Sequence, residues 1–137
     1  MAIENLPQTP PPARRRRVLI ADDNHDAADT LAMLLEMSGY EMCVAGDGEE
    51  AVSMAASFQP DAILLDIGMP RLDGYGACER IRLLPGASAA FIVALTGWGN
   101  EADKDRARAA GFDRHLVKPV DPAQLLEILA AVPALKP

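Results

Sequence analysis

Short apolar runs alternate with longer amphipathic segments along most of the chain. Five runs have the length of buried strands, and each is followed by a segment in which apolar residues recur every three or four positions. This alternation is typical of a parallel sheet whose strands are connected by helices. The predicted strands are residues 18–21, 41–45, 62–66, 91–95 and 115–117, and the predicted helices are residues 25–38, 47–57, 75–84, 100–110 and 121–132.

The third predicted strand differs from the others because it is an unbroken apolar run that ends in a carboxylate. Residues 62–65 are all apolar, Asp66 follows them, and Gly68 and Pro70 come directly after. A continuous apolar run indicates a strand that is buried on both faces. Its carboxyl end is where open α/β sheets bind their ligands. Because an unpaired charge is costly to bury, Asp66 is predicted to face partners from other strands.

Polar side chains also end three of the other predicted strands. The carboxyl ends of strands one, three, four and five carry, in that order, Asp22 and Asp23, then Asp66, then Thr96, then Lys118. The carboxyl ends of parallel strands lie at one edge of the sheet, so these side chains are predicted to converge there.

This combination of groups fits phosphoryl chemistry. Three carboxylates repel one another and require a cation, and Mg²⁺ prefers such oxygen ligands. The ammonium of Lys118 and the hydroxyl of Thr96 could hold phosphoryl oxygens that the metal does not reach. Asp66 is then predicted to be a nucleophile that accepts a phosphoryl group, and the backbone carbonyl of Gly68 could complete the metal shell.

Each element taken alone has an ordinary structural interpretation. An Asp-Asp pair before a helix is often an N-cap, Thr96-Gly97 resembles a common turn after a strand, and Lys118-Pro119 is a weak motif. Their occurrence together, at the ends of four different strands, is what favours a functional site.

Length and composition narrow the class of protein. The chain has 137 residues, half of them hydrophobic, which is one domain with a packed core. Apolar runs are too short for a membrane span, and no secretory signal is evident. The two cysteines, Cys43 and Cys78, have neither metal-site nor disulfide-framework spacing. A cytoplasmic location without membrane contact is expected.

The charge is distributed unevenly. The net charge is −7, but residues 1–17 carry four arginines and one glutamate, which leaves −10 on the remainder. An acidic body argues against nucleic-acid binding by this domain. Residues 1–16 are predicted to be a Pro- and Arg-rich disordered tail or linker, residues 17–133 the folded domain, and residues 134–137 a short tail. The run from Arg14 to Arg17 is interpreted as a solvated lead-in rather than a polyanion site.

Taken together, these motifs resemble the receiver domain of two-component response regulators. The resemblance covers residues 17–132 and is carried by Asp22-Asp23, residues 64–70, Asp73-Gly74, Leu95-Thr96-Gly97, Gly111 and Lys118-Pro119. It implies a flavodoxin-like, doubly wound parallel sheet of strand order 2-1-3-4-5 flanked by five helices. It also implies a signalling switch rather than an enzyme.

The resemblance assigns a role to each acidic residue. Asp66 resembles the acceptor of a phosphoryl group from a phosphohistidine, which a sensor histidine kinase or a histidine phosphotransfer protein would carry. Asp23 resembles the direct ligand of Mg²⁺, and Asp22 the residue that holds the ion through water. The carbonyl of Gly68 would be the backbone ligand.

The remaining positions resemble the parts that sense the phosphoryl group. Thr96 corresponds to the switch hydroxyl and Lys118 to the phosphate-binding lysine, whose bond to Pro119 would be cis. His115 stands where this family commonly has Tyr or Phe, so it is either a switch side chain or an ordinary edge histidine. Trp98 is hypothesised to cover the site or to contact a partner.

The destination of the signal is left open by the sequence. The charged helix at residues 100–110 is either simply solvated or, as in this family, part of a surface for partners or for a phosphorylation-dependent dimer. The chain is either a stand-alone receiver acting on a downstream protein or a domain of a larger chain, such as a hybrid histidine kinase, acting on a linked module.

Two alternative functions have weaker support. An aspartyl-nucleophile phosphatase of the haloacid dehalogenase type requires a second Asp two residues after the nucleophile, and this position is Gly68. A receiver-like docking module that is never phosphorylated would not need the complete set of Asp66, Thr96 and Lys118.

Overall fold

The computed structural model describes residues 15–97 and 101–132, and within them the chain forms one five-stranded parallel sheet. The spatial order of the strands is β2-β1-β3-β4-β5, which confirms the predicted doubly wound topology. The strands are β1 (Arg17–Ala21), β2 (Glu41–Ala45), β3 (Ala62–Asp66), β4 (Phe91–Thr96) and β5 (Arg114–Val117).

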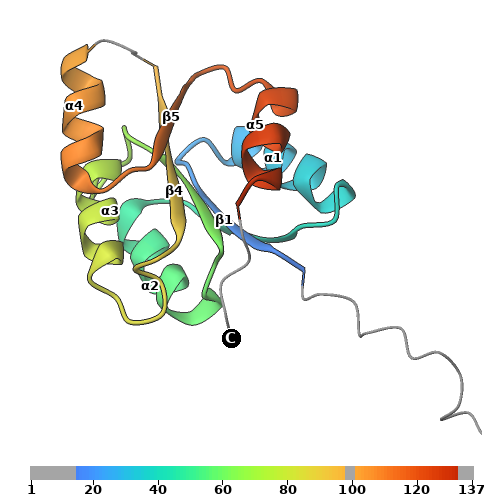
Figure 1. Cartoon of the computed structure of the whole chain (residues 1–137), viewed down its shortest axis with the longest axis horizontal. Coiled ribbons are helices and arrows are strands. Elements are labelled where there is room, and N and C mark those ends of the chain that lie inside the picture. The colour runs from blue at the N-terminus through green and yellow to red at the C-terminus, as the bar shows by residue number, and fades with distance from the viewer. Residues whose placement is uncertain (1–14, 98–100, 133–137) are drawn as a thin grey trace, which may run out of the picture.

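Helices cover both faces of this sheet, so the domain has three layers (Figure 1). Helices α1 and α5 lie on one face, and α2, α3 and α4 lie on the other. Their bounds are α1 (His25–Met37), α2 (Gly48–Phe58), α3 (Gly74–Arg82), α4 (Glu101–Ala110) and α5 (Pro122–Ala130). The predicted helix ends at residues 84 and 132 are wrong by two residues each, because α3 and α5 finish in tighter turns whose amides bond carbonyls three residues back.

The core consists of two apolar layers separated by the sheet. Ile63 and Leu65 of β3 pack toward α2, α3 and α4, whereas Leu64 packs toward α1 and α5. Successive residues of a strand point to opposite faces, so a strand covered on both sides must be apolar throughout. The unbroken apolar run before Asp66 is therefore explained by its central position between β1 and β4.

The register of the strands brings the predicted site residues to the same edge. Ala21 is opposite Leu65, so Asp22 follows β1 at the level where Asp66 ends β3. Thr96 is opposite Val117, the residue before Lys118. The backbone amide of Lys118 also donates to the carbonyl of Thr96 at 2.8 Å, which joins the ends of β4 and β5.

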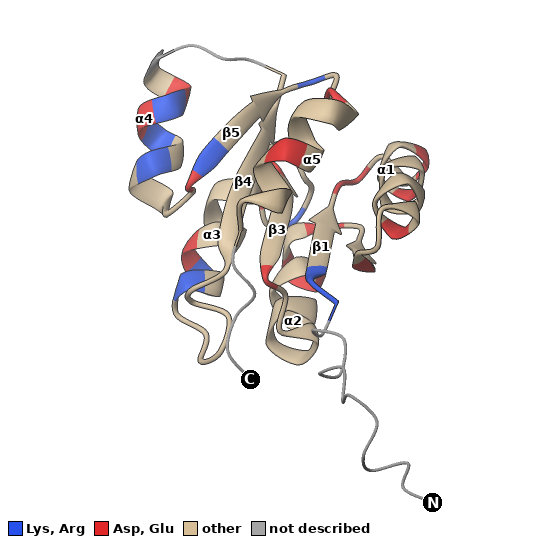
Figure 2. Ribbon diagram, turned by 45° about the vertical axis from the view of Figure 1, so that its right-hand side comes forward, with Lys and Arg blue, Asp and Glu red and all other residues tan. Residues whose placement is uncertain are grey.

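Helix α4 carries both acidic and basic residues (Figure 2). Arg108 and Asp105 form an exposed ion pair at 3.4 Å, as a solvated face would have. Arg106 is different, since its guanidinium lies 4.0 Å from the ring centroid of Tyr75 in α3 and ties the two helices together. Exposure to solvent therefore explains only some of the charged residues of α4.

Two residues of the arginine run are structural, so its interpretation as a solvated lead-in is wrong for them. Arg16 donates from Nη1 to the carbonyls of Leu129 and Ala130, both at 3.0 Å, at the end of α5. Arg17 donates from Nη1 to the carbonyl of Phe58, at 2.9 Å, at the end of α2. Because consecutive side chains alternate across a strand, the two arginines bond the last carbonyls of helices on opposite faces of the sheet.

Replacing Arg16 with alanine is expected to destabilise the domain by about 1–2 kcal/mol, since two carbonyls at the end of α5 lose a charged donor. Urea denaturation followed by circular dichroism measures this loss. Arg15 is exposed and serves as the matched control, with an expected change within about 0.5 kcal/mol. Equal stabilities for both variants would contradict the capping role.

Some predictions concern residues outside the described ranges. The proposed tail at residues 1–14, Trp98, Asn100 and residues 133–137 fall there, and the domain boundaries stay predictions. Within the described part of the chain, no helix has both the length and the apolar composition needed to cross a bilayer.

Candidate metal centre at the carboxyl edge of the sheet

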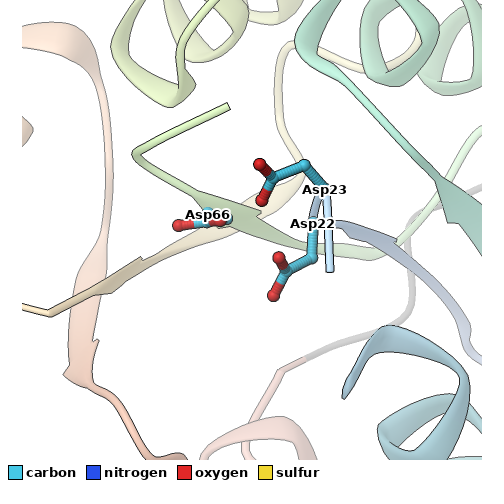
Figure 3. Close-up of side chains that lie close together, drawn as sticks. All are labelled: Asp22, Asp23 and Asp66. Carbon is cyan, nitrogen blue, oxygen red and sulfur yellow. The ribbon is translucent and has the colours of Figure 1, made fainter. Parts of the chain in front are cut away.

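Three carboxylates meet where β1 and β3 end (Figure 3). Asp22, Asp23 and Asp66 each offer an oxygen, and these oxygens lie within 4.8 Å of one another. Asp22 and Asp66 are buried, whereas Asp23 is exposed. The cluster therefore has a buried floor and one solvent-facing side, so an ion could enter and keep part of its water shell.

Local backbone geometry fixes the orientation of the two buried carboxylates. Oδ1 of Asp22 accepts from the backbone amide of Asn24 at 2.9 Å. Oδ1 of Asp66 accepts from the backbone amide of Gly68 at 3.2 Å. In both residues this leaves Oδ2 directed at other partners.

Lys118 supplies the cation that both carboxylates share. Its Nζ lies 3.2 Å from Oδ2 of Asp22 and 3.2 Å from Oδ2 of Asp66. The side chain is about one-third exposed, so the ammonium is reachable from solvent while it bridges the two strand ends. The peptide bond between Lys118 and Pro119 is cis.

The electrostatics of the site oppose the ionisation of Asp66. Burial and the nearby charge of Asp22 raise the pKa of Asp66, while the amide of Gly68 and the ammonium of Lys118 act in the opposite direction and do not cancel this increase. Burial disfavours the ammonium, yet its hydrogen bond to Asp22 and the charge of Asp66 outweigh this and raise the pKa of Lys118. One ammonium therefore does not neutralise the negative charge of three carboxylates.

These residues fit a hard divalent cation. All donors in the cluster are carboxylate oxygens, one side faces solvent, and the local charge with Lys118 included is still negative. Mg²⁺ binds through one or two carboxylates, keeps several waters and shares its sphere with phosphate oxygens. The donor set and its partial exposure match these requirements.

Two glycines, Gly68 and Gly74, lie in or next to the loop that follows β3. Gly68 is exposed, and a β-carbon added there would have no atom within 4 Å, so nothing crowds the entrance beside Asp66. The role of its carbonyl as a ligand stays a prediction. Gly74 lies at the other end of this loop and packs against its start. A β-carbon at Gly74 would lie only 2.5 Å from the carbonyl oxygen of Asp66.

Thr96 and His115 come together, although they lie on different strands. Both line a small cavity between the sheet and helices α3 and α4, with Tyr75 and Lys104 among the other lining residues. Thr96 and His115 are each partly buried. Sequence reasoning missed Tyr75 and Lys104, because their position depends on how α3 and α4 pack and no local motif signals it.

The raised pKa of Asp66 leads to a prediction about stability. In the metal-free protein the folded state binds this proton more tightly than the unfolded chain. Stability contributed by protonated Asp66 is therefore lost as the pH rises from the ordinary carboxyl range through the raised pKa. Asp66→Asn is expected to remove this loss and to stabilise the metal-free protein at neutral pH.

Urea denaturation in the presence of a chelator, at several pH values between 4 and 8, tests this expectation. The quantity of interest is the difference between the wild-type protein and Asp66→Asn, because carboxyl groups away from this cluster contribute equally to both. A difference that does not grow with pH would contradict the assigned electrostatics.

The site is thus an acidic cluster with a lysine at the carboxyl edge of a doubly wound parallel sheet. The family model described as "Response regulator receiver domain" matches residues 18–130. The chain belongs to this family, whose members are signalling modules rather than catalytic enzymes.

Individual relatives and structures agree with this assignment. An uncharacterized 14.6 kDa protein of Leptolyngbya boryana is 35% identical over 112 residues, which is 82% of this chain and 86% of that protein. The DNA-binding dual master transcriptional regulator RpaA of Synechocystis is 37% identical over 118 residues, 86% of this chain but 48% of that protein. The chain thus spans about half the length of this regulator.

Two solved structures have the same fold. The chemotaxis protein CheY4 of Vibrio cholerae superposes with a TM-score of 0.82 at 30% identity, covering 87% of this chain and 99% of that one. The receiver domain of the sensor histidine kinase PA1611 of Pseudomonas aeruginosa gives a TM-score of 0.77 at 33% identity, covering 84% and 94%. That structure has a magnesium ion coordinated in its active-site cleft.

Proposed function

We propose that this domain is a phospho-accepting switch of a two-component or phosphorelay system, and that Asp66 accepts the phosphoryl group. One observation carries the proposal: the buried carboxylate of Asp66 shares the ammonium of Lys118 with Asp22, inside an acidic cluster suited to a divalent cation. A nucleophile, a positive charge and a metal site in one place are the requirements of phosphoryl acceptance.

In the reaction, a carboxylate oxygen of Asp66 attacks the phosphorus of a phosphohistidine. The new O–P bond forms as the P–N bond breaks, and the histidine leaves as imidazole after taking up a proton from solvent. Lys118 binds an oxygen of the transferred group and holds it in line with Asp66. Asp23 would hold Mg²⁺ directly, Asp22 through water and Gly68 through its carbonyl, and the bound ion would offset the negative charge of the phosphoryl oxygens.

The signal would pass through Thr96 and His115. A phosphoryl oxygen on Asp66 accepts a hydrogen bond from the hydroxyl of Thr96 and draws this side chain toward the site. The cavity that both residues line supports this idea, because Thr96 and His115 border the same space. His115 then turns inward and the loops after β4 and β5 shift with it.

The partners follow from this chemistry. The phosphoryl donor would be a sensor histidine kinase or a histidine phosphotransfer protein. The receiver of the signal would be a downstream protein or a covalently linked module, including that of a hybrid histidine kinase. A phosphorylation-dependent dimer through the surface of α4 and β5 is a further proposal, because this surface borders the switch residues.

Incubation with a small phosphodonor such as phosphoramidate, followed by intact-protein mass spectrometry, tests the function. The wild-type protein with Mg²⁺ should gain one phosphoryl group, and Asp66→Asn should gain none. Chelation of Mg²⁺ should slow the reaction strongly. A folded wild-type protein that binds Mg²⁺ yet gains no phosphoryl group would favour a docking module that is never phosphorylated.

A phosphatase of the haloacid dehalogenase type is a poorer match to the site. Gly68 is exposed and has no carboxyl group that could protonate a leaving group. Steady release of inorganic phosphate from a range of phosphate monoesters would be required to support the phosphatase alternative.

A further inference from the structure

The turn between β2 and α2 holds together the two loops that carry the predicted metal ligands. We call residues 46–48 the bridging turn. It supplies none of the proposed ligands, yet it contacts His25, which follows the β1–α1 loop that contains Asp23, and Arg71 and Leu72 of the β3–α3 loop, which contains Gly68. Contacts on both sides of the turn connect these loops.

On the side of the β1–α1 loop, the contacts are one backbone hydrogen bond beside the turn and one packing contact with the turn. The amide of Asp22 donates to the carbonyl of Ala45 at 3.1 Å, immediately before the turn. The imidazole of His25 lies against Gly46, with Cε1 3.0 Å from the point where a β-carbon would stand.

On the side of the β3–α3 loop, the turn makes a charged and a steric contact. Nη1 of Arg71 lies 2.8 Å from Oδ2 of Asp47, and the side chain of Asp47 is 13% exposed whereas that of Arg71 is 71% exposed. The carbonyl oxygen of Leu72 occupies the place that a β-carbon at Gly48 would take. Only glycine at this position lets the two loops approach so closely.

The backbone of Arg71 is strained. Its φ is +67°, and the amide of Leu72 donates to the carbonyl of Pro70 at 2.8 Å across it. A positive φ with a hydrogen bond between residues two apart is the classic γ-turn, which is rare and strained. Glycine would adopt this conformation without strain, so neighbouring contacts must hold the arginine in it.

We propose that Arg71 and Asp47 form a latch that holds the β3–α3 loop in position to bind the metal. The latch fixes Arg71 in its strained conformation and thereby fixes the backbone between Asp66 and Gly74, in which Gly68 lies. Arg71 and Asp47 would be positioning residues, because neither is among the residues that would hold the metal or the phosphoryl group. The consequence for the metal rests on the proposed function, whereas the consequence for the loop does not.

The two carboxylate oxygens of Asp47 have different partners, so one substitution can remove the ion pair and keep the helix cap. Oδ1 accepts from the amide of Glu50 at 2.8 Å and caps helix α2, while Oδ2 pairs with Arg71. Asp47→Asn keeps an oxygen for the cap and removes the charge that holds Arg71. Its effect on the loop is therefore separable from loss of the helix cap.

The first experiment is hydrogen–deuterium exchange of the metal-free protein, resolved by NMR. The amides of Leu72 and Gly74, which bond within the loop, should exchange about two- to fivefold faster in Asp47→Asn and in Arg71→Ala. Arg71→Lys should restore most of the protection. Asp105→Asn, which removes an exposed ion pair on α4, is the matched control and should leave these amides unchanged.

The second experiment is a calorimetric titration with Mg²⁺, in which charge and positioning predict opposite signs for Arg71→Ala. Arg71→Ala removes a positive charge near the site, so electrostatics alone would tighten Mg²⁺ binding. The latch predicts that binding weakens about two- to fivefold, as it also does in Asp47→Asn. Arg71→Gly should bind more tightly than Arg71→Ala, because glycine needs no latch to adopt the γ-turn.

The outcomes separate this inference from the proposed function. If Arg71→Ala exchanges like the wild-type protein, or binds Mg²⁺ more tightly, the latch is overturned. If the wild-type protein binds no Mg²⁺ while the exchange pattern follows the prediction, the latch holds the loop but the metal site of the proposed function is wrong.

Discussion

Replacing Lys118 with alanine is expected to slow phosphoryl acceptance by Asp66 by about 100- to 1,000-fold. This range is typical for loss of one preorganised charge at a reacting oxygen. The ammonium lies 3.2 Å from both Asp22 and Asp66, so it is already in place before the phosphoryl group arrives. Rates of labelling by phosphoramidate in the presence of saturating Mg²⁺ measure the effect.

The same variant should bind Mg²⁺ at least as tightly as the wild-type protein. Lys118 competes with the metal as the cation between two carboxylates, and its removal leaves the acidic cluster more negative. A slow reaction together with undiminished Mg²⁺ affinity would show that the site is intact and that the lost rate is due to the missing ammonium. Arg108→Ala on α4 is the control, since its side chain is 70% exposed. A labelling rate within a few-fold of wild type in Lys118→Ala would contradict the account.

Replacing Leu64 with alanine is expected to destabilise the domain by about 2–5 kcal/mol, the range for truncating a fully buried leucine. Leu64 is completely buried in the central strand and belongs to the apolar layer beneath α1 and α5. Because it lies two residues before Asp66, the cavity should also disturb the site. Urea denaturation gives the free energy of unfolding, and Mg²⁺ titration gives the secondary effect.

Leu83→Ala provides the matched comparison, since the same side chain is removed at a position that is 84% exposed. Its free energy of unfolding should change by less than about 0.5 kcal/mol. Similar losses for both leucines would mean that the layer beneath α1 and α5 is not the main source of stability.

The fold could be predicted because its signals are local and repeated. The unbroken apolar run before Asp66 indicates a central strand, and helical periodicity between the runs indicates the covering helices. Helix ends were less predictable. Residues 83–84 and 131–132 continue the apolar pattern of α3 and α5, but they fold into turns, and the difference between a last helical turn and a tighter turn is small in energy.

The composition of the site could also be predicted, because its members end strands and parallel strands end at one edge. Its supporting contacts could not. Arg16 and Arg17 looked like a solvated run, but Arg17, which begins β1, and Arg16, which precedes it, bond the ends of two different helices. The pair of Arg71 and Asp47 joins loops that lie 24 residues apart, and no periodicity or motif marks such a contact.

Locating the modified residue shows whether Asp66 is the phosphoryl acceptor. The acyl phosphate formed with phosphoramidate and Mg²⁺ is reduced with borohydride, which converts the modified aspartate to homoserine, and the peptides are sequenced by mass spectrometry. Homoserine is expected at position 66 alone. Homoserine at position 22 or 23, or a phosphoryl group on His25 or His115, would contradict it.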